Sequence, residues 1–193
     1  MEERQNEKKC SVCGGKIPAM TKTQISDGII CPPCSRICTL SPLASTEAIK
    51  NAWEENHRRF KNFKATMQLT NIGRGYLFID MPQQYAYITN HKKPKLEPVV
   101  FSFSEIEEYR MEMVGQETIT KTKGGLGRAV VGGALFGTAG AVVGASTAKT
   151  ETKTTGGIPM LYITLNINGL KTVTSISSPP YNANEALDNM MNL

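Results

Sequence analysis

This chain has few of the residues that enzymes use for acid–base, nucleophilic or metal-assisted chemistry. Its 193 residues include only five histidines and aspartates together, which are His57, His91, Asp27, Asp80 and Asp188. They do not show the spacing of a hydrolytic metal site or of a nucleophile with its base. The run Gly124-Gly125-Leu126-Gly127 lacks the G-x-x-x-x-G-K-[ST] pattern of a phosphate-binding loop. We therefore expect that the protein is not an enzyme.

Aromatic residues are absent from the first forty positions, which contain no Phe, Tyr or Trp. Proteins that bind single-stranded nucleic acid stack bases on such rings, so this absence favours protein contact for the N-terminal part. Basic residues that can contact phosphates are nevertheless present there, namely Lys8, Lys9, Lys16, Lys22 and Arg36. A nucleic-acid-binding regulator that uses this part therefore stays as an alternative, and the net charge of +5 permits it without requiring it.

A secretory signal and a long leucine-rich span are also missing. The N-terminal residues MEERQNEKK are polar and charged, which predicts a location in a reducing cytoplasm. Without a leucine-rich span, the chain is not a conventional multi-span membrane protein. All five cysteines fall in the first forty residues, and their odd number favours metal ligands over a disulfide framework.

Two C-x2-C pairs, Cys10/Cys13 and Cys31/Cys34, are separated by seventeen residues. This spacing is typical of a zinc site in which both pairs, each in a tight turn, bind the same metal ion. Four thiolates would complete the tetrahedral coordination of the metal and leave no position for water, so we predict a structural Zn²⁺ ion. The alternative is that the cysteines are unbound or redox-active. A module of about forty residues buries too little core to fold without such a metal. Cys38 is predicted to be a buried thiol or spare cysteine instead of a fifth ligand.

The remaining chain alternates between helix and strand patterns. Ser45 or Thr46 is predicted to cap a helix that runs to about His57 and is followed by basic residues. From residue 63 the pattern becomes β, and Asn168-Gly169 is typical of a hairpin turn. Residues 182–193 are predicted to form a helix. Meandering strands closed by one C-terminal helix predict a small β-barrel or curved sheet whose open end the helix fills.

A glycine-rich segment, residues 124–148, contains twenty successive residues without a charge, from position 129 to 148. Gly133, Gly137, Gly140 and Gly144 recur at spacings of four, three and four, which places them on one stripe of a helix. Each glycine costs a helix about 0.5–1 kcal/mol, so the stripe indicates close packing against another backbone, as in a glycine zipper. The alternative is a glycine-rich surface loop. Apolar residues occupy the opposite face, namely Val130, Leu135, Phe136, Val142 and Val143.

The length of this segment limits what it can do at a membrane. A single helix of twenty residues spans about 30 Å, but one crossing would separate the strands before it from those after it. We therefore predict a helical hairpin, whose arms are too short to span a bilayer. It would insert into one leaflet, pack on the barrel, or pair with other subunits. The flanking Arg128 and Lys149 would either contact anionic headgroups or keep the hairpin soluble.

Several stretches resemble known families. CSVCGG and DGIICPPC are similar to an uncharacterised zinc-ribbon domain at the N-terminus of many bacterial and phage proteins. The stretches YLFID, FSFSEIEEY, GRAVVGGALFGTAGAVVG, LYITLNI and residues 181–193 resemble the bacterial pleckstrin-homology-like (PH-like) domains that often follow it. The resemblance implies a zinc ribbon and a PH-like barrel with a glycine-zipper insertion, and it implies no enzymatic activity.

The sequence thus predicts an α+β protein with three parts. Residues 1–40 form a small zinc ribbon with four cysteine ligands, and residues 41–62 form a linker helix. Residues 63–193 form a PH-like β-barrel with a C-terminal helix. A glycine-rich helical hairpin is inserted in this barrel at residues 124–148. The predicted function is a non-enzymatic zinc-binding adaptor that contacts a protein partner or an anionic membrane surface, peripherally at its inner face. A self-assembling homo-oligomer is the remaining alternative. The predicted contact residues are Gly133, Gly137, Gly140, Gly144, Leu135, Phe136, Arg128 and Lys149.

Overall fold

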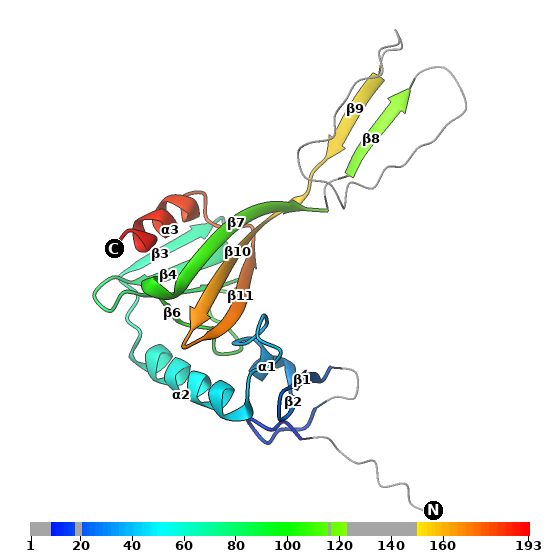
Figure 1. The fold of residues 1–193 in the computed structure, drawn as a ribbon. Coiled ribbons are helices and arrows are strands. Elements are labelled where there is room, and N and C mark those ends of the chain that lie inside the picture. The colour runs from blue at the N-terminus through cyan, green and yellow to red at the C-terminus, as the bar shows by residue number, and fades with distance from the viewer. Residues whose placement is uncertain (1–8, 18–20, 116, 123–149) are drawn as a thin grey trace, which may run out of the picture. The chain divides into compact units, whose positions relative to one another are not determined.

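The computed structural model describes residues 9–17, 21–115, 117–122 and 150–193 (Figure 1). The chain divides into two compact units, the first comprising Met1–Met111 with Met160–Leu193 and the second Glu112–Pro159. All eight predicted contact residues of the glycine-rich segment lie outside the described residues, so its helical hairpin stays a prediction. In the described part, no helix combines the length and the apolar character that crossing a membrane would require.

The first unit begins with a small hairpin, in which β1 (Thr23–Ile25) pairs antiparallel with β2 (Gly28–Ile30). Gly28 pairs with Ile25, so Ser26 and Asp27 form the turn between the two strands. The short helix α1 (Pro32–Ser35) follows directly. Ile30 and Ile37 are fully buried next to these elements and supply part of the core of the unit.

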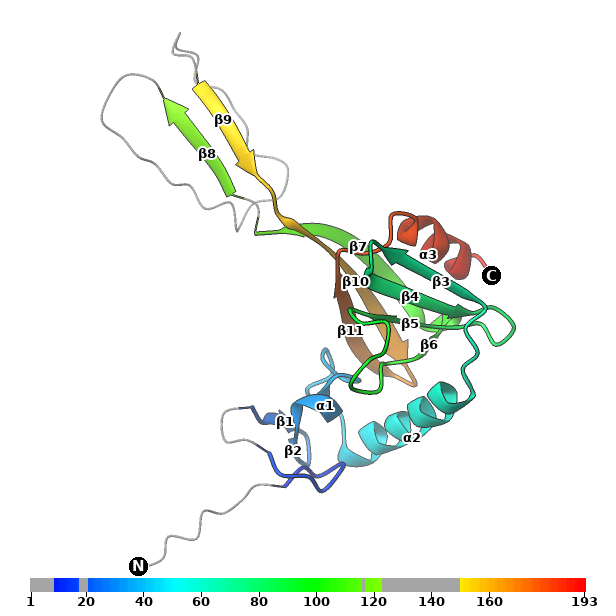
Figure 2. The ribbon, with the colours of Figure 1, turned by 180° about the vertical axis from the view of Figure 1, so that it is seen from behind.

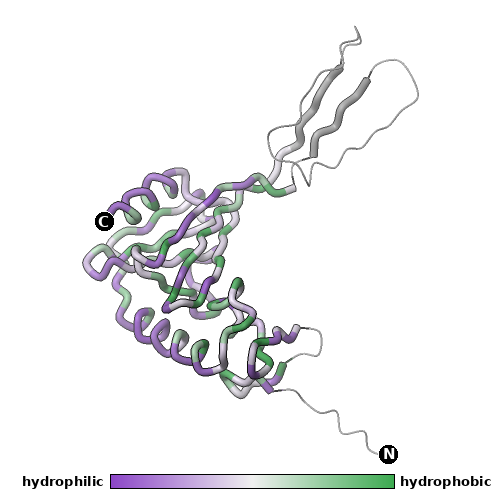
Figure 3. The backbone as a smooth tube through the Cα atoms, in the orientation of Figure 1, coloured by the Kyte–Doolittle hydropathy of each residue, from purple (hydrophilic) through white to green (hydrophobic). Residues whose placement is uncertain are grey.

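Helix α2 (Thr46–Asn62) starts where the sequence predicts, because the Ser45 side chain accepts a hydrogen bond of 3.2 Å from the backbone N–H of Ala48. The helix extends five residues beyond the predicted end at His57. Its buried residues, Ile49, Ala52, Asn56 and Arg59, recur at helical spacing, so the buried face becomes polar toward the C-terminus. Figure 3 shows this mainly hydrophilic helix with its few apolar positions.

Two sheets follow, and most of their residues belong to the first unit. The strand orders are β3-β4-β5-β6 and β11-β10-β7, and Figure 2 shows β4 and β5 lying between β3 and β6. Their bounds are Met67–Asn71 for β3, Arg74–Asp80 for β4, Tyr85–Thr89 for β5, Phe101–Ser102 for β6, Ile106–Val114 for β7, Ile158–Ile167 for β10 and Leu170–Ser177 for β11. A short 3-10 helix, η1 (Phe103–Glu105), connects β6 to β7.

The run of residues 99–103 has a β pattern in the sequence, but only the two residues of β6 pair as a strand. The backbone of Val100 explains the difference, because its N–H donates to Asn56 Oδ1 at 2.7 Å and its carbonyl accepts from Arg59 Nη1 at 3.3 Å. Both bonds come from side chains of α2. The strand pairing therefore starts only at Phe101, which pairs with Ala86.

The core lies between the two sheets and is closed by α3 (Ala183–Met191). Leu77 and Phe101 of the first sheet and Leu161 of the second are fully buried in one cluster with Leu187 of α3. The predicted C-terminal helix is therefore present as α3, and its Leu187 packs in this core. The fold is a mixture of α and β elements with open sheets, and the described strands do not show a closed barrel.

The second unit contains a hairpin of two strands, β8 (Glu117–Thr122) and β9 (Thr150–Thr155). They pair antiparallel, with Glu117 opposite Thr155 and Thr122 opposite Thr150. The pairing therefore places Thr122 and Thr150, the described residues on either side of positions 123–149, opposite each other.

Candidate metal centre

The first cysteine pair lies in a tight turn. The N–H of Gly14 donates to the carbonyl of Cys10 at 2.8 Å, and the N–H of Cys10 donates to the carbonyl of Gly15 at 2.8 Å. Gly14 has a φ of +70°, a left-handed conformation that residues with a Cβ rarely adopt. The CSVCGG stretch therefore folds into a turn that holds Cys10 and Cys13 on the same side.

The second pair combines the end of a strand with a helical turn. Cys31 follows β2 directly, and Cys34 lies in α1, whose first turn contains Pro32 and Pro33. Proline suits this position because the first N–H groups of a helix have no intrahelical partner. The N–H of Ser35 donates to the carbonyl of Cys31 at 3.0 Å, which fixes the turn between the two cysteines.

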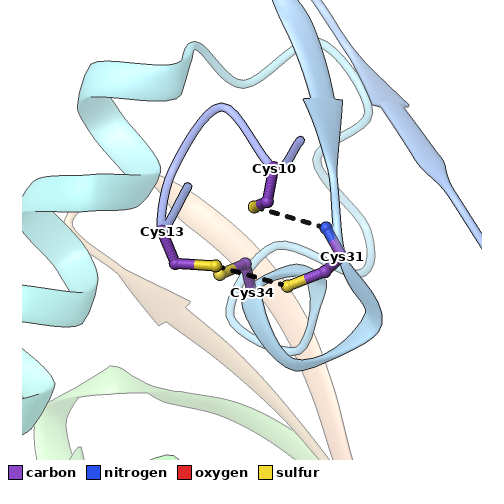
Figure 4. Close-up of side chains that lie close together, drawn as sticks. All are labelled: Cys10, Cys13, Cys31 and Cys34. Atoms are coloured by element: carbon purple, nitrogen blue, oxygen red, sulfur yellow. Dashed lines mark hydrogen bonds between the residues drawn. The ribbon is translucent and has the colours of Figure 1, made fainter. Parts of the chain in front are cut away.

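The four cysteines converge, as Figure 4 shows, and their Sγ atoms all lie within 4.8 Å of one another. The Sγ atoms of Cys13 and Cys31 are 3.8 Å apart. Tetrahedral coordination with metal–sulfur bonds of about 2.3 Å places sulfur atoms about 3.8 Å apart, so this separation fits a single bound ion. The four cysteines that the spacing singled out therefore form a site that could hold a metal ion.

Ionisation of the thiols depends on burial and on backbone hydrogen bonds. Burial opposes ionisation of Cys10, but N–H groups of Cys13, Cys31 and Val12 outweigh it and lower the pKa of Cys10 from 9.0 to about 7. One of these bonds, from the N–H of Cys31 to Cys10 Sγ, measures 3.4 Å. Burial and neighbouring thiols raise the pKa of Cys34. Because a bound cation favours the thiolate form, a metal would offset that cost.

The surroundings of the cluster shield three of its cysteines, and Cys13, Cys31 and Cys34 border a hollow of about 680 Å³. Cys10, Cys31 and Cys34 are buried, whereas Cys13 is exposed. The indole Nε1 of Trp53 donates to the carbonyl of Cys34 at 3.0 Å, and the guanidinium of Arg36 lies 5.3 Å from the centre of the Trp53 ring. Residues of α2 and of the segment after β2 therefore pack around the second cysteine pair.

Cys38 is buried but is not part of the cluster, as the sequence predicts. Its Sγ donates to the carbonyl of Ser35 at 3.5 Å, and burial raises its pKa. It behaves as a small core residue.

The acidic residues Glu105, Glu107, Glu108 and Glu112 have the sequence pattern of a solvated face. Glu105 departs from this expectation, because it binds Arg59 through two hydrogen bonds of 2.6 and 2.9 Å. The S-x-x-E spacing of Ser102 and Glu105 is a usable signal, because it forms the capping box at the start of η1. Arg59, near the end of α2, is therefore engaged in an ion pair.

Comparison with known families gives two matches. Residues 62–176, more than half of the chain, match the family described as a glycine-zipper-containing PH domain. Residues 8–53, which contain all four clustered cysteines, match a domain of unknown function, DUF4428. No curated protein and no solved structure showed a significant similarity to the chain. The match over residues 62–176 shows that the chain belongs to the family of glycine-zipper-containing PH domains.

Proposed function

We propose that the protein is a non-enzymatic adaptor whose zinc ion makes the N-terminal module and the PH-like domain one platform. The observation that carries this proposal is the convergence of four cysteine sulfurs within 4.8 Å. Four thiolates around Zn²⁺ leave no coordination position for water or substrate, so the metal would be structural.

The junction between the N-terminal module and β11 supports the platform. The Thr172 hydroxyl is fully buried and donates to the carbonyl of Arg36 at 2.6 Å. The N–H of Leu40 donates to the carbonyl of Lys171 at 3.0 Å, and the N–H of Val173 donates to Thr39 Oγ1 at 2.8 Å. Bonds of this kind hold the metal-binding part against the sheet.

The contact function is assigned to the glycine-rich segment. The support is its small-residue spacing, its basic flanks, the family match, and the β8–β9 pairing, in which Thr122 lies opposite Thr150. It would contact an anionic membrane surface or a protein partner. The nucleic-acid alternative is weaker, because Arg59 is bound to Glu105 and Arg58 is bound to Glu55 at 2.7 Å.

Metal analysis of the purified chain tests the first part. We expect one zinc ion per chain, loss of that zinc in Cys31→Ser, and retention in the matched control Cys38→Ser, because Cys38 lies outside the cluster. Equal zinc content in all three proteins would contradict the assignment.

Vesicle sedimentation tests the second part. We expect the protein to bind vesicles of phosphatidylcholine and phosphatidylserine in equal parts, and Gly137→Leu to bind less, because a large side chain blocks close helix packing. Gly156→Leu is the control, since Gly156 is exposed and a Cβ there meets nothing within 4 Å. Unchanged binding of Gly137→Leu would refute the zipper's role. If the unmodified protein does not bind the vesicles, contact with a protein partner remains as the proposed role of the glycine-rich segment.

A further inference from the structure

Strand β3 lies at the edge of the first sheet, and its outer side has no pairing partner among the described residues. It pairs with β4 on one side only, with Leu69 opposite Leu77. In the part of the chain that the structure describes, no backbone hydrogen bond joins the outer side of β3 to another segment. The free N–H and C=O groups of such an edge are a template for one more strand.

The other edge strands of the two sheets are protected in ways that β3 is not. Strand β6 is only two residues long, and β7 carries charged residues at four of its nine positions. Strand β11 is bonded to the N-terminal module through the N–H groups of Leu40 and Val173. Strand β3 has neither a charged residue nor a proline, and its bulge lies only at Thr70/Asn71. The usual devices that block an edge are therefore missing from most of β3.

A hollow of about 220 Å³ lies beside this edge, between β3 and α3, which Figures 1 and 2 both show next to each other. Met67, Leu69 and Ile79 line it from one face of the sheet, because Met67 pairs with Ile79 and side chains alternate along a strand. Ala186 and Met190 line it from α3. Small-molecule sites occupy roughly 300–1,000 Å³, so this smaller apolar hollow suits a side chain of a longer partner.

The helix side of the hollow supplies polar groups that are not in use. Asn182, Glu185 and Asn189 line it at spacings of three and four residues, which places them in one row along α3 and its N-cap. Their side chains make no hydrogen bond or ion pair with any described residue. An extended peptide has backbone polar groups along both of its edges. Here β3 would bond one edge of the peptide, and the amides of Asn182 and Asn189 would bond the other.

The charge of the lining indicates the kind of peptide. Among the described residues around the hollow, Glu185 is the only charged one, so a lysine or arginine of the peptide would complement it. A second copy of β3 could match the backbone, but its five residues offer no cation to Glu185. We propose that β3 and α3 bind an extended segment of a partner protein as an added strand, with an apolar side chain in the hollow and a basic one at Glu185. This surface is separate from the glycine-rich segment, so either contact can fail without the other.

Selection of random peptides displayed on phage, with the purified full chain as bait, supplies the probe. We expect enriched peptides to combine apolar residues with a lysine or arginine, and fluorescence polarisation then measures their affinity. Met67→Lys places a charge at the open edge, where Met67 is 46% exposed, and should weaken binding about tenfold or more. Ile72→Lys is the matched control, because Ile72 is 88% exposed and lies outside the hollow. It should change affinity by no more than about twofold.

A charge exchange tests the role of Glu185. Glu185→Lys should weaken binding of the enriched peptide about tenfold or more, and a peptide whose basic residue is replaced by glutamate should recover binding to this variant. Glu54→Lys, which makes the same change at an exposed position of α2, should do neither. Loss of binding through a damaged fold would not be recovered by changing the peptide.

Hydrogen exchange tests the added strand itself. We expect the enriched peptide to slow exchange at alternate amides of β3, because every second N–H of an edge strand points outward. The proposal is overturned if no peptide is enriched, if Ile72→Lys weakens binding as much as Met67→Lys, if the exchanged charges do not restore binding, or if β3 amides stay unprotected in the complex. It is also overturned if light scattering shows a dimer whose β3 amides are protected without peptide, since a second copy would then occupy the edge.

Discussion

Arg59 is a charged side chain placed in the interior, with 9% of its side chain exposed. Its guanidinium donates to both oxygens of Glu105, to Glu55 at 3.0 Å and to the carbonyl of Val100 at 3.3 Å. It also lies 5.1 Å from the centre of the Tyr85 ring. A charged side chain in the interior is stable only while its hydrogen-bond partners are present. The position of α2 therefore depends on the segment around η1, which supplies Glu105.

Substitution of Glu105 by glutamine tests this dependence. The change keeps the shape of the side chain but leaves the Arg59 charge without its main partner, so we expect a loss of about 3–5 kcal/mol in the free energy of unfolding. Urea unfolding provides the measurement. Lys171→Ala is the comparison, because Lys171 pairs with Glu107 at the surface and should contribute about 1 kcal/mol or less. If both variants lose the same free energy of unfolding, the interior ion pair contributes no more to stability than the surface pair.

The cysteines and Arg59 differ in how far their roles could be predicted from sequence. Each cysteine pair is local, and the C-x2-C spacing alone indicates a shared metal. Arg59 and Glu105 are 46 residues apart, and no sequence pattern predicts that α2 packs against η1. Only the internal Glu55–Arg59 spacing of four residues within α2 pointed to a partner for the arginine.

At the scale of elements, the strand β4 contains a glycine that the packing requires. Gly75 has a φ of +59°, and a Cβ there would lie 2.3 Å from the carbonyl oxygen of Ser178, just beyond the end of β11. The backbones of the two sheets therefore approach too closely at this point for any side chain. The sequence shows a glycine at the start of a predicted strand, but not what lies across from it.

Replacement of Gly75 by alanine should cost about 2 kcal/mol or more, because the unfavourable φ and the backbone clash act together. Gly169→Ala separates the two effects: Gly169 also has a positive φ, +83°, but a Cβ there meets nothing within 4 Å. We expect it to cost only about 1 kcal/mol. Thermal unfolding compares the two, and the same shift in melting temperature for both would contradict the clash.

At the scale of the whole molecule, the metal centre and the sheets share a junction. Trp53 and Arg36 pack beside the second cysteine pair, and Arg36 also donates to the carbonyl of Glu97 at 2.8 Å in the loop after β5. The carbonyl of Arg36 accepts from the buried Thr172 hydroxyl. Loss of the proposed zinc should therefore loosen the junction with β11, and not only the cysteine turns.

Removal of the proposed zinc with a chelator, followed by hydrogen exchange, measures that coupling. We expect the amides of Leu40 and Val173, which donate across the junction, to exchange about tenfold faster or more. The amides of Leu77 and Ile88, which lie in the paired strands β4 and β5, should change much less. Unchanged exchange at Leu40 and Val173 would mean that the sheet holds the N-terminal module without the metal.

The sequence by itself determined the local features: the four clustered cysteines, the Ser45 cap, the Asn168-Gly169 turn and the closing helix. Each depends on residues that are close in the chain, so spacing and residue type are enough to specify it. The tertiary structure decided which distant residues meet. It shortened β6, because α2 side chains bind the backbone of Val100, and it buried Glu105 against Arg59.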